Sequence, residues 1–206
     1  DAEVSQVASA TGMVLGATVW LLLPGIVLFA ASIPAPASAQ DKPSRAQVER
    51  GRYLVTTSGC HDCHTPMKMG ANGPEPDMSR MLSGHPEALV MPPAPRLPEG
   101  PWMMTTSATN TAWAGPWGVS FTTNLTPDAE TGLGKWTLKN FKDTLRTGRH
   151  MGRGRPILPP MPIPAYSQFN DADLEAIFTY LQSIPAVKNR VPEPALPATR
   201  VAQVAG

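Results

Sequence analysis

Three residues in one short run could hold a metal-containing cofactor together. Cys60, Cys63 and His64 stand in the sequence Cys-His-Asp-Cys-His. Because they occupy positions i, i+3 and i+4, one helical turn would present two thiols and an imidazole on the same side. Two cysteines separated by two residues and followed directly by histidine form the signature of c-type haem attachment. The run therefore predicts one covalently attached haem c, with both thiols bound to its vinyl groups and His64 bound to its iron.

The two cysteines, which are the only ones in the chain, also allow other interpretations. A Cys-x-x-Cys pair can be a thioredoxin-like redox centre, half of a zinc site or a disulfide. Zinc needs two further ligands, and the remaining histidines, His61, His85 and His150, are scattered. A thioredoxin-like centre requires alternating strands and helices, which this proline-rich chain does not predict. Haem attachment is the favoured interpretation.

A second iron ligand is expected from a proline-rich loop late in the chain. Met161 lies in Pro-Pro-Met-Pro-Ile-Pro, where the prolines restrict the backbone and hold a flexible thioether in place. Met opposite His is a common pair of haem ligands, so we predict that His64 and Met161 bind the iron. His150 and Met151 are the competing candidates. The following methionines are expected to fill the core: Met67, Met69, Met78, Met81, Met91, Met103 and Met104.

Two amphipathic helices are predicted to position this site. Ser44 can cap a helix over about residues 45–57, and Asn170 can cap a second that runs up to Pro185. Gly51 should let the two helices cross closely, with Tyr180 packed over it. Crossed N- and C-terminal helices resemble the class I cytochrome c fold, so the expected fold is mainly α. The inward-facing positions follow helical spacing: Val48, Gly51, Leu54 and Val55 in the first helix, and Leu174, Ile177, Phe178 and Leu181 in the second.

The middle of the chain carries a further pattern, Asn-Leu-Thr-Pro-Asp at 124–128 and Thr-Gly-Leu-Gly-Lys-Trp at 131–136. Its residues alone indicate a turn-rich segment. Together with the Pro-Pro-Met-Pro loop and the last helix, it resembles the haem subunits of membrane-bound alcohol and gluconate dehydrogenases over about residues 45–185. The resemblance implies that this segment lines the haem. Those subunits carry several haems, whereas this chain has one attachment motif.

Polar and aromatic side chains complete the predicted haem site. Four tryptophans could pack on the ring or donate an indole N–H to a propionate, and Trp117 and Trp136 are preferred over Trp102 and Trp113 because of the segments in which they lie. Asn124 is included because it begins the pattern that the resemblance places at the haem. The expected cofactor-binding set is Cys60, Cys63, His64, Met161, Trp117, Asn124, Trp136, Arg153 and Arg155.

Charge gathers between residues 135 and 155, where seven basic residues accompany a single acidic one, Asp143. One interpretation is a basic face that docks an acidic electron-transfer partner and steers its approach. Another is that Arg149, Arg153 and Arg155 neutralise the haem propionates. Over the whole chain the net charge is only +1, which gives no sign of nucleic-acid binding.

Composition divides the 206 residues into three parts. Residues 1–39 are predicted to be an N-terminal anchor, because residues 13–33 are apolar for long enough to span a bilayer. Residues 40–185 form the haem domain, with a long proline-rich loop insertion; the chain has 24 prolines, roughly 12% against a background of about 5%, which predicts extended connections rather than a regular sheet. Residues 186–206 are rich in Pro and Ala and are expected to form an extended tail.

The N-terminal segment has an alternative interpretation as a secretory signal, cleaved between Ala39 and Gln40. Its apolar run is longer than a usual signal core, which favours a single-pass anchor. Basic residues follow the run, and the positive-inside rule alone would place the haem domain in the cytoplasm. Covalent haem attachment takes place outside the cytoplasmic membrane, so we predict a periplasmic haem domain.

These features predict a membrane-tethered electron carrier rather than an enzyme, with no small-molecule substrate. The anchor and the basic face would bind a membrane-embedded electron-transfer complex. Anchored single-haem cytochromes are similar to the donor subunits of homodimeric photosynthetic reaction centres, which makes a reaction centre the first hypothesis for the partner. The alternative is a haem subunit that passes electrons from a membrane-bound dehydrogenase toward quinone or an oxidase. An open-site haem enzyme or gas sensor is the third hypothesis.

Overall fold

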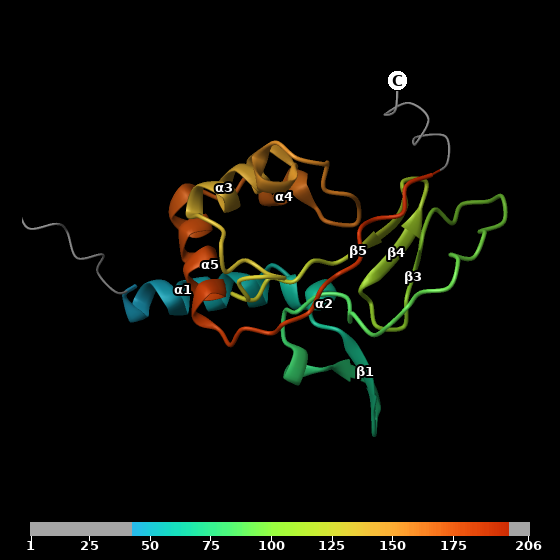
Figure 1. The fold of residues 1–206 in the computed structure, drawn as a ribbon, viewed down its shortest axis with the longest axis horizontal. Coiled ribbons are helices and arrows are strands. Elements are labelled where there is room, and N and C mark those ends of the chain that lie inside the picture. Colours follow the sequence, from blue (N-terminus) through green and yellow to red (C-terminus); the bar gives the residue numbers. More distant parts are fainter. Residues whose placement is uncertain (1–42, 198–206) are drawn as a thin grey trace, which may run out of the picture. The chain divides into compact units, whose positions relative to one another are not determined.

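The computed structural model describes residues 43–197 (Figure 1). Within this range, more residues lie in helices than in strands. The domain is mainly helical and cytochrome c-like, with two small antiparallel sheets. In chain order its elements are α1 (Arg45–Thr57), α2 (Cys60–His64), β1 (Met67–Gly70), β2 (Gly73–Pro76), the 3-10 helix η1 (Met78–Arg80), β3 (Thr105–Thr106), β4 (Ala112–Gly115), β5 (Gly118–Phe121), α3 (Leu138–Thr147), the 3-10 helix η2 (His150–Gly152), α4 (Ile163–Tyr166) and α5 (Asp171–Ser183).

Helices α1 and α5 begin at the predicted caps. The Ser44 side chain accepts a hydrogen bond from the backbone N–H of Gln47 (N···O 3.2 Å), which satisfies one of the free donors at the start of α1. The Asn170 side chain accepts in the same way from the backbone N–H of Asp173 (2.8 Å) at the start of α5. Both predicted helices are therefore confirmed, together with the residues that start them.

The two helices cross at Gly51, as the sequence predicts. A Cβ atom at Gly51 would collide with the carbonyl of Ala176 and would lie 2.7 Å from the Cβ of Tyr180. Glycine is therefore required at this position by the approach of α5. The crossing sets the middle of α1 against the middle of α5.

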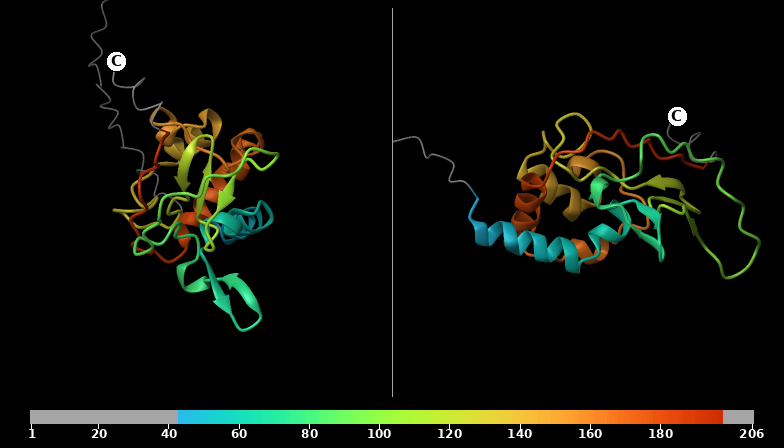
Figure 2. Two further views of the ribbon diagram at one scale, coloured as in Figure 1. Left: turned by 90° about the vertical axis from the view of Figure 1, so that its right-hand side faces the viewer. Right: turned by 90° about the horizontal axis from the view of Figure 1, so that it is seen from below.

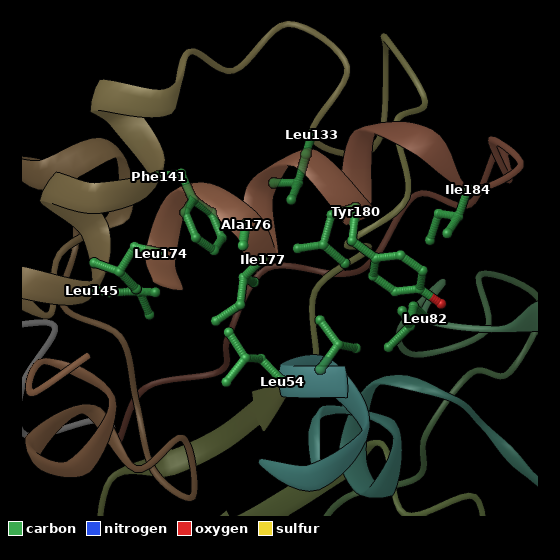
Figure 3. Close-up of a cluster of buried hydrophobic side chains, with 12 residues drawn as sticks. Leu54, Leu82, Leu133, Phe141, Leu145, Leu174, Ala176, Ile177, Tyr180 and Ile184 are labelled. Carbon is green, nitrogen blue, oxygen red and sulfur yellow. The ribbon is translucent and has the colours of Figure 1, made fainter. Parts of the chain in front are cut away.

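The hydrophobic core lies where α1, α3 and α5 meet, and Figure 3 shows their side chains pointing toward one another. Leu174 is fully buried, and Leu54, Ile177 and Leu181 are nearly so. Leu145 and Phe141 add the contribution of α3. Because the core is built mainly from these three helices, their packing fixes their positions relative to one another.

Two short sheets occupy the proline-rich middle of the chain and were not predicted from the sequence. β1 pairs with β2 in a hairpin, and β4 lies between β3 and β5 in an antiparallel sheet. The hairpin projects away from the helices (Figure 2). This position corrects the expectation that most methionines fill the core. Four of those seven are exposed, because they lie on the hairpin, on η1 or on the loop before β3: Met69, Met78, Met103 and Met104.

Residues 186–197 run in an extended conformation along the haem domain, and we call them the C-terminal strap. Figure 1 shows the strap in red, leaving the end of α5 and reaching the β4–β5 hairpin. Ala195 and Val119 exchange two backbone hydrogen bonds (N···O 2.9 and 2.7 Å) at that hairpin. At the other end of the strap, Asn189 is only 1% exposed. Composition predicts a separate extended tail, whereas in the structure residues of this segment pack against the preceding domain.

The predicted membrane span at residues 13–33 lies outside the described residues. Within residues 43–197, none of the helices has both the length and the apolar character needed to cross a bilayer.

Candidate haem site

The short helix α2 presents the three residues of the attachment motif. Gly59 precedes it with a φ of 72°, a left-handed conformation that lets the chain turn sharply from α1 into α2. Cys60 and Cys63 are free thiols of intermediate burial, and His64 is buried. One helical turn therefore holds both thiols and the imidazole side by side, as their spacing predicts.

The orientation of His64 is fixed by a backbone carbonyl. Its Nδ1 lies 2.8 Å from the carbonyl oxygen of Thr123, which can only accept, so Nδ1 carries the proton. Burial lowers the pKa of His64, and the ring is neutral near pH 7. A neutral imidazole with Nδ1–H bonded to a carbonyl leaves the Nε2 lone pair free, which is the arrangement that a metal-binding histidine needs.

The protonation of the cysteines disfavours a thioredoxin-like centre. Burial raises the pKa of Cys60 to about 11, and it also raises the pKa of Cys63. Reactive cysteines of redox pairs have lowered pKa values instead. Within residues 43–197, no group of three or more His, Cys, Asp or Glu side chains is arranged to hold a metal ion.

A cavity of about 450 Å³ opens beside α2. Its walls come from α2, β5, the segment 121–136, α3, the loop 157–163, α5 and the strap. Most of the lining side chains are apolar, among them Leu133, Phe141, Ile157 and Leu181. Volume and lining are those of a site for a small organic ligand or cofactor. With two thiols and a free imidazole nitrogen at one side, the residues present fit a covalently held haem.

Met161 lies in the lining of this cavity, as predicted for the second iron ligand. The loop that carries it is held by Ser120, whose hydroxyl donates to the carbonyl of Pro159 (2.6 Å). His150, a competing candidate, lines the cavity as well and stands edge-on against Trp136 with 5.1 Å between ring centroids. Met151 lies outside the lining and is 37% exposed. The geometry leaves Met161 and His150 as candidates and does not favour Met151.

Three further predicted residues line the cavity: Asn124, Trp136 and Arg155. Asn124 is 3% exposed, but its amide is already bonded to its neighbours. It donates to the carbonyl of Val187 (2.8 Å) and accepts from the backbone N–H of Thr126 (2.9 Å). Asn124 therefore joins the segment 124–136 to the strap.

Trp117 and Arg153, which are also in the predicted set, do not lie in the lining of the cavity. Trp117 sits in the β4–β5 turn with its ring against Gly115, and its indole N–H donates to the hydroxyl of Ser120 (3.3 Å). Its contact with the cavity passes through Ser120. Arg153 follows the 3-10 helix η2 and is exposed. The glycines on either side of Arg153 let this turn run along the surface rather than into the cavity.

Sequence reasoning missed two parts of the cavity wall, the strap and Tyr166. Residues 190–194 of the strap all line the cavity. Tyr166, in α4, lines it too and donates its hydroxyl to the carbonyl of Ser58 at the end of α1. Burial raises the pKa of Tyr166 to about 12, so it stays protonated as a donor. An extended segment without an apolar stripe gives no periodic signal, which is why the strap could not be found from sequence.

The basic segment 135–155 is less free than its composition suggests. Four of its cations pair with carboxylates, and two of these carboxylates come from other parts of the chain, Asp171 and Glu193. Asp171 lies 2.8 Å from Arg146 and 3.3 Å from Lys142, and Glu193 lies 3.2 Å from Arg155. A basic excess remains, because seven cations meet three carboxylates, but it is smaller than predicted.

Comparison with known proteins identifies distant relatives along most of the chain. No family model matches it. The alcohol dehydrogenase (quinone) cytochrome c subunit of Gluconobacter oxydans is 29% identical over 177 residues, which is 84% of this chain and 29% of that protein. The fructose dehydrogenase cytochrome subunit of Gluconobacter japonicus is 29% identical over 90% of this chain and 31% of its own length.

A third relative, from Pseudomonas putida, is one of the subunits of nicotinate dehydrogenase, and it is 28% identical over 87% of this chain and 12% of its own length. The chain spans less than a third of each of these relatives. Their names agree with the resemblance noted in the sequence, and none refers to a reaction centre. Over most of its length, the chain is distantly similar to the cytochrome c subunits of bacterial dehydrogenases.

Proposed function

We propose that this chain is a single-haem c-type cytochrome that transfers electrons within a dehydrogenase complex. One observation carries the proposal: α2 and the Met161 loop bring two thiols, an oriented histidine and a thioether to a single apolar cavity. In this proposal, Cys60 and Cys63 attach the haem, and His64 and Met161 bind its iron. When bound, the haem iron supplies one-electron transfer between its ferrous and ferric states.

The residues around the cavity set the conditions for that transfer. Apolar walls from α3, α5 and the segment 121–136 exclude water from the cofactor, and the Thr123 carbonyl keeps His64 in the ligating tautomer. Arg155 is the cation from the basic segment that lines the cavity, which makes it the candidate partner of a propionate. None of these residues needs to act as a nucleophile or as an acid–base catalyst.

The direction of electron flow is proposed from the relatives. They are subunits of alcohol, fructose and nicotinate dehydrogenases, and the first of them has quinone in its name. We infer that electrons enter this chain from a dehydrogenase subunit and leave toward quinone or an oxidase. A reaction-centre partner has no comparable support, because the sequence resemblance was its only basis.

The proposed location is the outer face of the cytoplasmic membrane. Its support is the apolar run at residues 13–33 together with the requirement that haem be attached outside the cytoplasm. Tethering there would confine the domain to the plane of the membrane and raise its effective concentration at a membrane partner.

The test is reduction of the haem by a dehydrogenase substrate, measured on protein extracted from native membranes. Tagged protein is purified in mild detergent, and ethanol, fructose, gluconate or nicotinate is added while the reduced c-type absorption band is recorded. The proposal predicts that a dehydrogenase co-purifies and that its substrate reduces the haem. The matched control is the Cys60→Ala/Cys63→Ala variant, which should show no such band. A haem that none of the substrates reduces, but that light oxidises in a pigmented complex, would contradict the proposal and restore the reaction-centre hypothesis.

A further inference from the structure

One wall of the haem cavity is a segment without regular structure that is held at both ends. Residues 190–194 line the cavity, and the strap is anchored immediately before them at Asn189 and immediately after them at Ala195. Between these two points, the described residues give the strap no partner strand, and its one backbone hydrogen bond runs from the Arg190 N–H to the Glu87 carboxylate (3.0 Å). Its position over the cavity therefore depends on the anchors.

The first anchor is a buried amide whose hydrogen-bonding capacity is fully used. Asn189 donates from Nδ2 to the carbonyls of Ser83 and His85, both at 2.8 Å. Its Oδ1 accepts from Arg80 Nη2 and from the backbone N–H of Glu87, again both at 2.8 Å. An amide is the side chain that offers two donors and two acceptor sites in this geometry. We call Asn189 with these four partners the Asn189 clamp.

The second anchor depends on a glycine. Ala195 and Val119 exchange two backbone hydrogen bonds, and Gly118, next to Val119, has a φ of 96°. A Cβ atom at Gly118 would collide with the carbonyl of Ala195 and would lie 3.0 Å from the Cα of Leu196. Both the positive φ and the close approach of the strap therefore require glycine at this position.

The stretch between the anchors has few ways to move. Pro192 and Pro194 fix two of its backbone φ angles. Glu193, between them, pairs with Arg155, which also lines the cavity (3.2 Å). Glu193 is largely exposed, so this pair adds little energy and is a weak attachment.

Resting on the haem function proposed above, we propose that residues 190–194 form a fixed wall that keeps water and small ligands from the haem edge, and that Asn189 is the residue that positions this wall. Asn189 itself does not line the cavity and acts only through the strap. Water at the haem edge stabilises the ferric form, which carries one more positive charge than the ferrous form. A loosened wall therefore lowers the reduction potential and opens the iron to added ligands.

The experiment compares the haem-loaded wild type with Asn189→Ala. Three quantities are measured: amide hydrogen exchange at Ala195, the reduction potential, and the affinity of the ferric protein for imidazole. Removing a fully bonded buried amide should make the Ala195 amide exchange about tenfold faster. The potential should fall, and imidazole should bind more tightly. The matched control is Ala186→Ser, which alters an exposed, uncharged position on the same strap and should leave all three quantities unchanged.

A second variant keeps the proposal testable where Asn189→Ala does not fold. Pro192→Gly retains every contact of the Asn189 clamp and loosens only the wall, so it should change all three quantities in the same direction by smaller amounts. Faster exchange with an unchanged potential and imidazole affinity would show that the strap does not protect the haem. Unchanged exchange in Asn189→Ala would show that the clamp does not position the strap. A wild type without covalent haem would refute the proposed function itself, which the spectrum reveals before any variant is compared.

Discussion

At the scale of single residues, the site rests on a division of roles within a few side chains. His64 donates a hydrogen bond from Nδ1 to the Thr123 carbonyl, which leaves the Nε2 lone pair free to bind a metal. Cys60 and Cys63 remain protonated because burial raises their pKa values. Raised pKa values do not suit a thiolate pair that exchanges disulfides. The second iron ligand is the residue for which the geometry offers a choice.

Replacing Met161 by Ala should remove the thioether ligand from the iron. The Met–iron charge-transfer band should disappear, the reduction potential should fall, and the ferrous protein should bind carbon monoxide readily, because a Met/His pair raises the potential and fills the sixth position. Met151→Ala is the control and should keep the wild-type spectrum, since Met151 lies outside the cavity lining.

His150→Ala decides between the two remaining candidates. If Met161 is the ligand, His150→Ala should keep the Met–iron band and lose only the edge-on contact with Trp136. If His150→Ala loses the native spectrum and Met161→Ala keeps it, His150 is the iron ligand and Met161 only lines the cavity.

At the scale of elements, the crossing of α1 and α5 places the haem-binding helix. Gly51 lies at the contact, and no side chain larger than hydrogen fits against the Ala176 carbonyl. Since α2 follows α1 after a two-residue turn, a shift of α1 would move both cysteines and the histidine. The crossing is therefore a structural requirement of the site.

Gly51→Ala should destabilise the domain, although Gly→Ala inside a helix usually stabilises. The helix-propensity gain is about 1 kcal/mol, whereas forcing extra volume into a packed contact costs about 1–3 kcal/mol. With a collision against backbone, we expect the free energy of unfolding to fall by about 1–2 kcal/mol, measured by urea denaturation. Arg45→Ala, at an exposed position of the same helix, should change it by less than about 0.5 kcal/mol. An increase in stability for Gly51→Ala would show that the helices do not approach this closely.

The turn-rich segment 124–136 is organised by a carboxylate, which makes its stability depend on pH. Asp128 accepts hydrogen bonds from the Thr131 hydroxyl (2.6 Å), the Thr131 backbone N–H (2.8 Å) and the Glu130 backbone N–H (3.1 Å). The Thr131 hydroxyl is the main cause that lowers the pKa of Asp128 below its ordinary value of about 3.8. Its stabilisation is therefore fully present above that value and is lost as the pH falls through the lower pKa of the folded state.

Asp128→Asn should lower stability near pH 7 and flatten the loss of stability below about pH 4, because the charged acceptor is gone. The measurement is the free energy of unfolding from urea denaturation at a series of pH values. Glu99→Gln, on an exposed loop, is the control. Parallel pH profiles for Asp128→Asn and the wild type would contradict the role given to this carboxylate.

At the scale of the whole molecule, local signals predicted the helices and distant contacts completed the site. The caps at Ser44 and Asn170 and the apolar stripes of α1 and α5 are properties of short segments, and these helices formed as expected. The motif on α2, Met161, Asn124, Trp136 and Arg155 reached the cavity. The strap was missed because Asn189 and Ala195 are fixed by partners about a hundred and about seventy-five residues earlier in the chain, which no local pattern reveals.

The same reasoning explains the differences. Residue type and neighbourhood place Trp117 and Arg153 at the haem, whereas in the structure a tight turn in one case and flanking glycines in the other keep them out of the cavity lining. The exposed methionines were assigned to the core because an apolar side chain carries no information on whether its segment projects from the fold.

The cavity also predicts that the domain needs its cofactor to fold stably. Without the cofactor, the apolar side chains that line the cavity stay in contact with water, so haem binding adds hydrophobic stabilisation to the folded state. Protein made without haem should therefore lose its near-ultraviolet circular dichroism and unfold without a sharp transition. A sharp urea transition at the midpoint of the haem-loaded protein would contradict this.

Covalent haem attachment is tested most directly by the mass of the denatured, acid-extracted chain produced in cells that carry out c-type haem attachment. We expect a wild-type chain heavier by one haem, which is retained after denaturation because both thioether bonds are covalent. Cys60→Ala/Cys63→Ala should have the mass of the polypeptide alone. A wild-type chain with no added mass, or with Cys60 and Cys63 joined in a disulfide, would contradict the haem assignment and the electron-transfer function built on it.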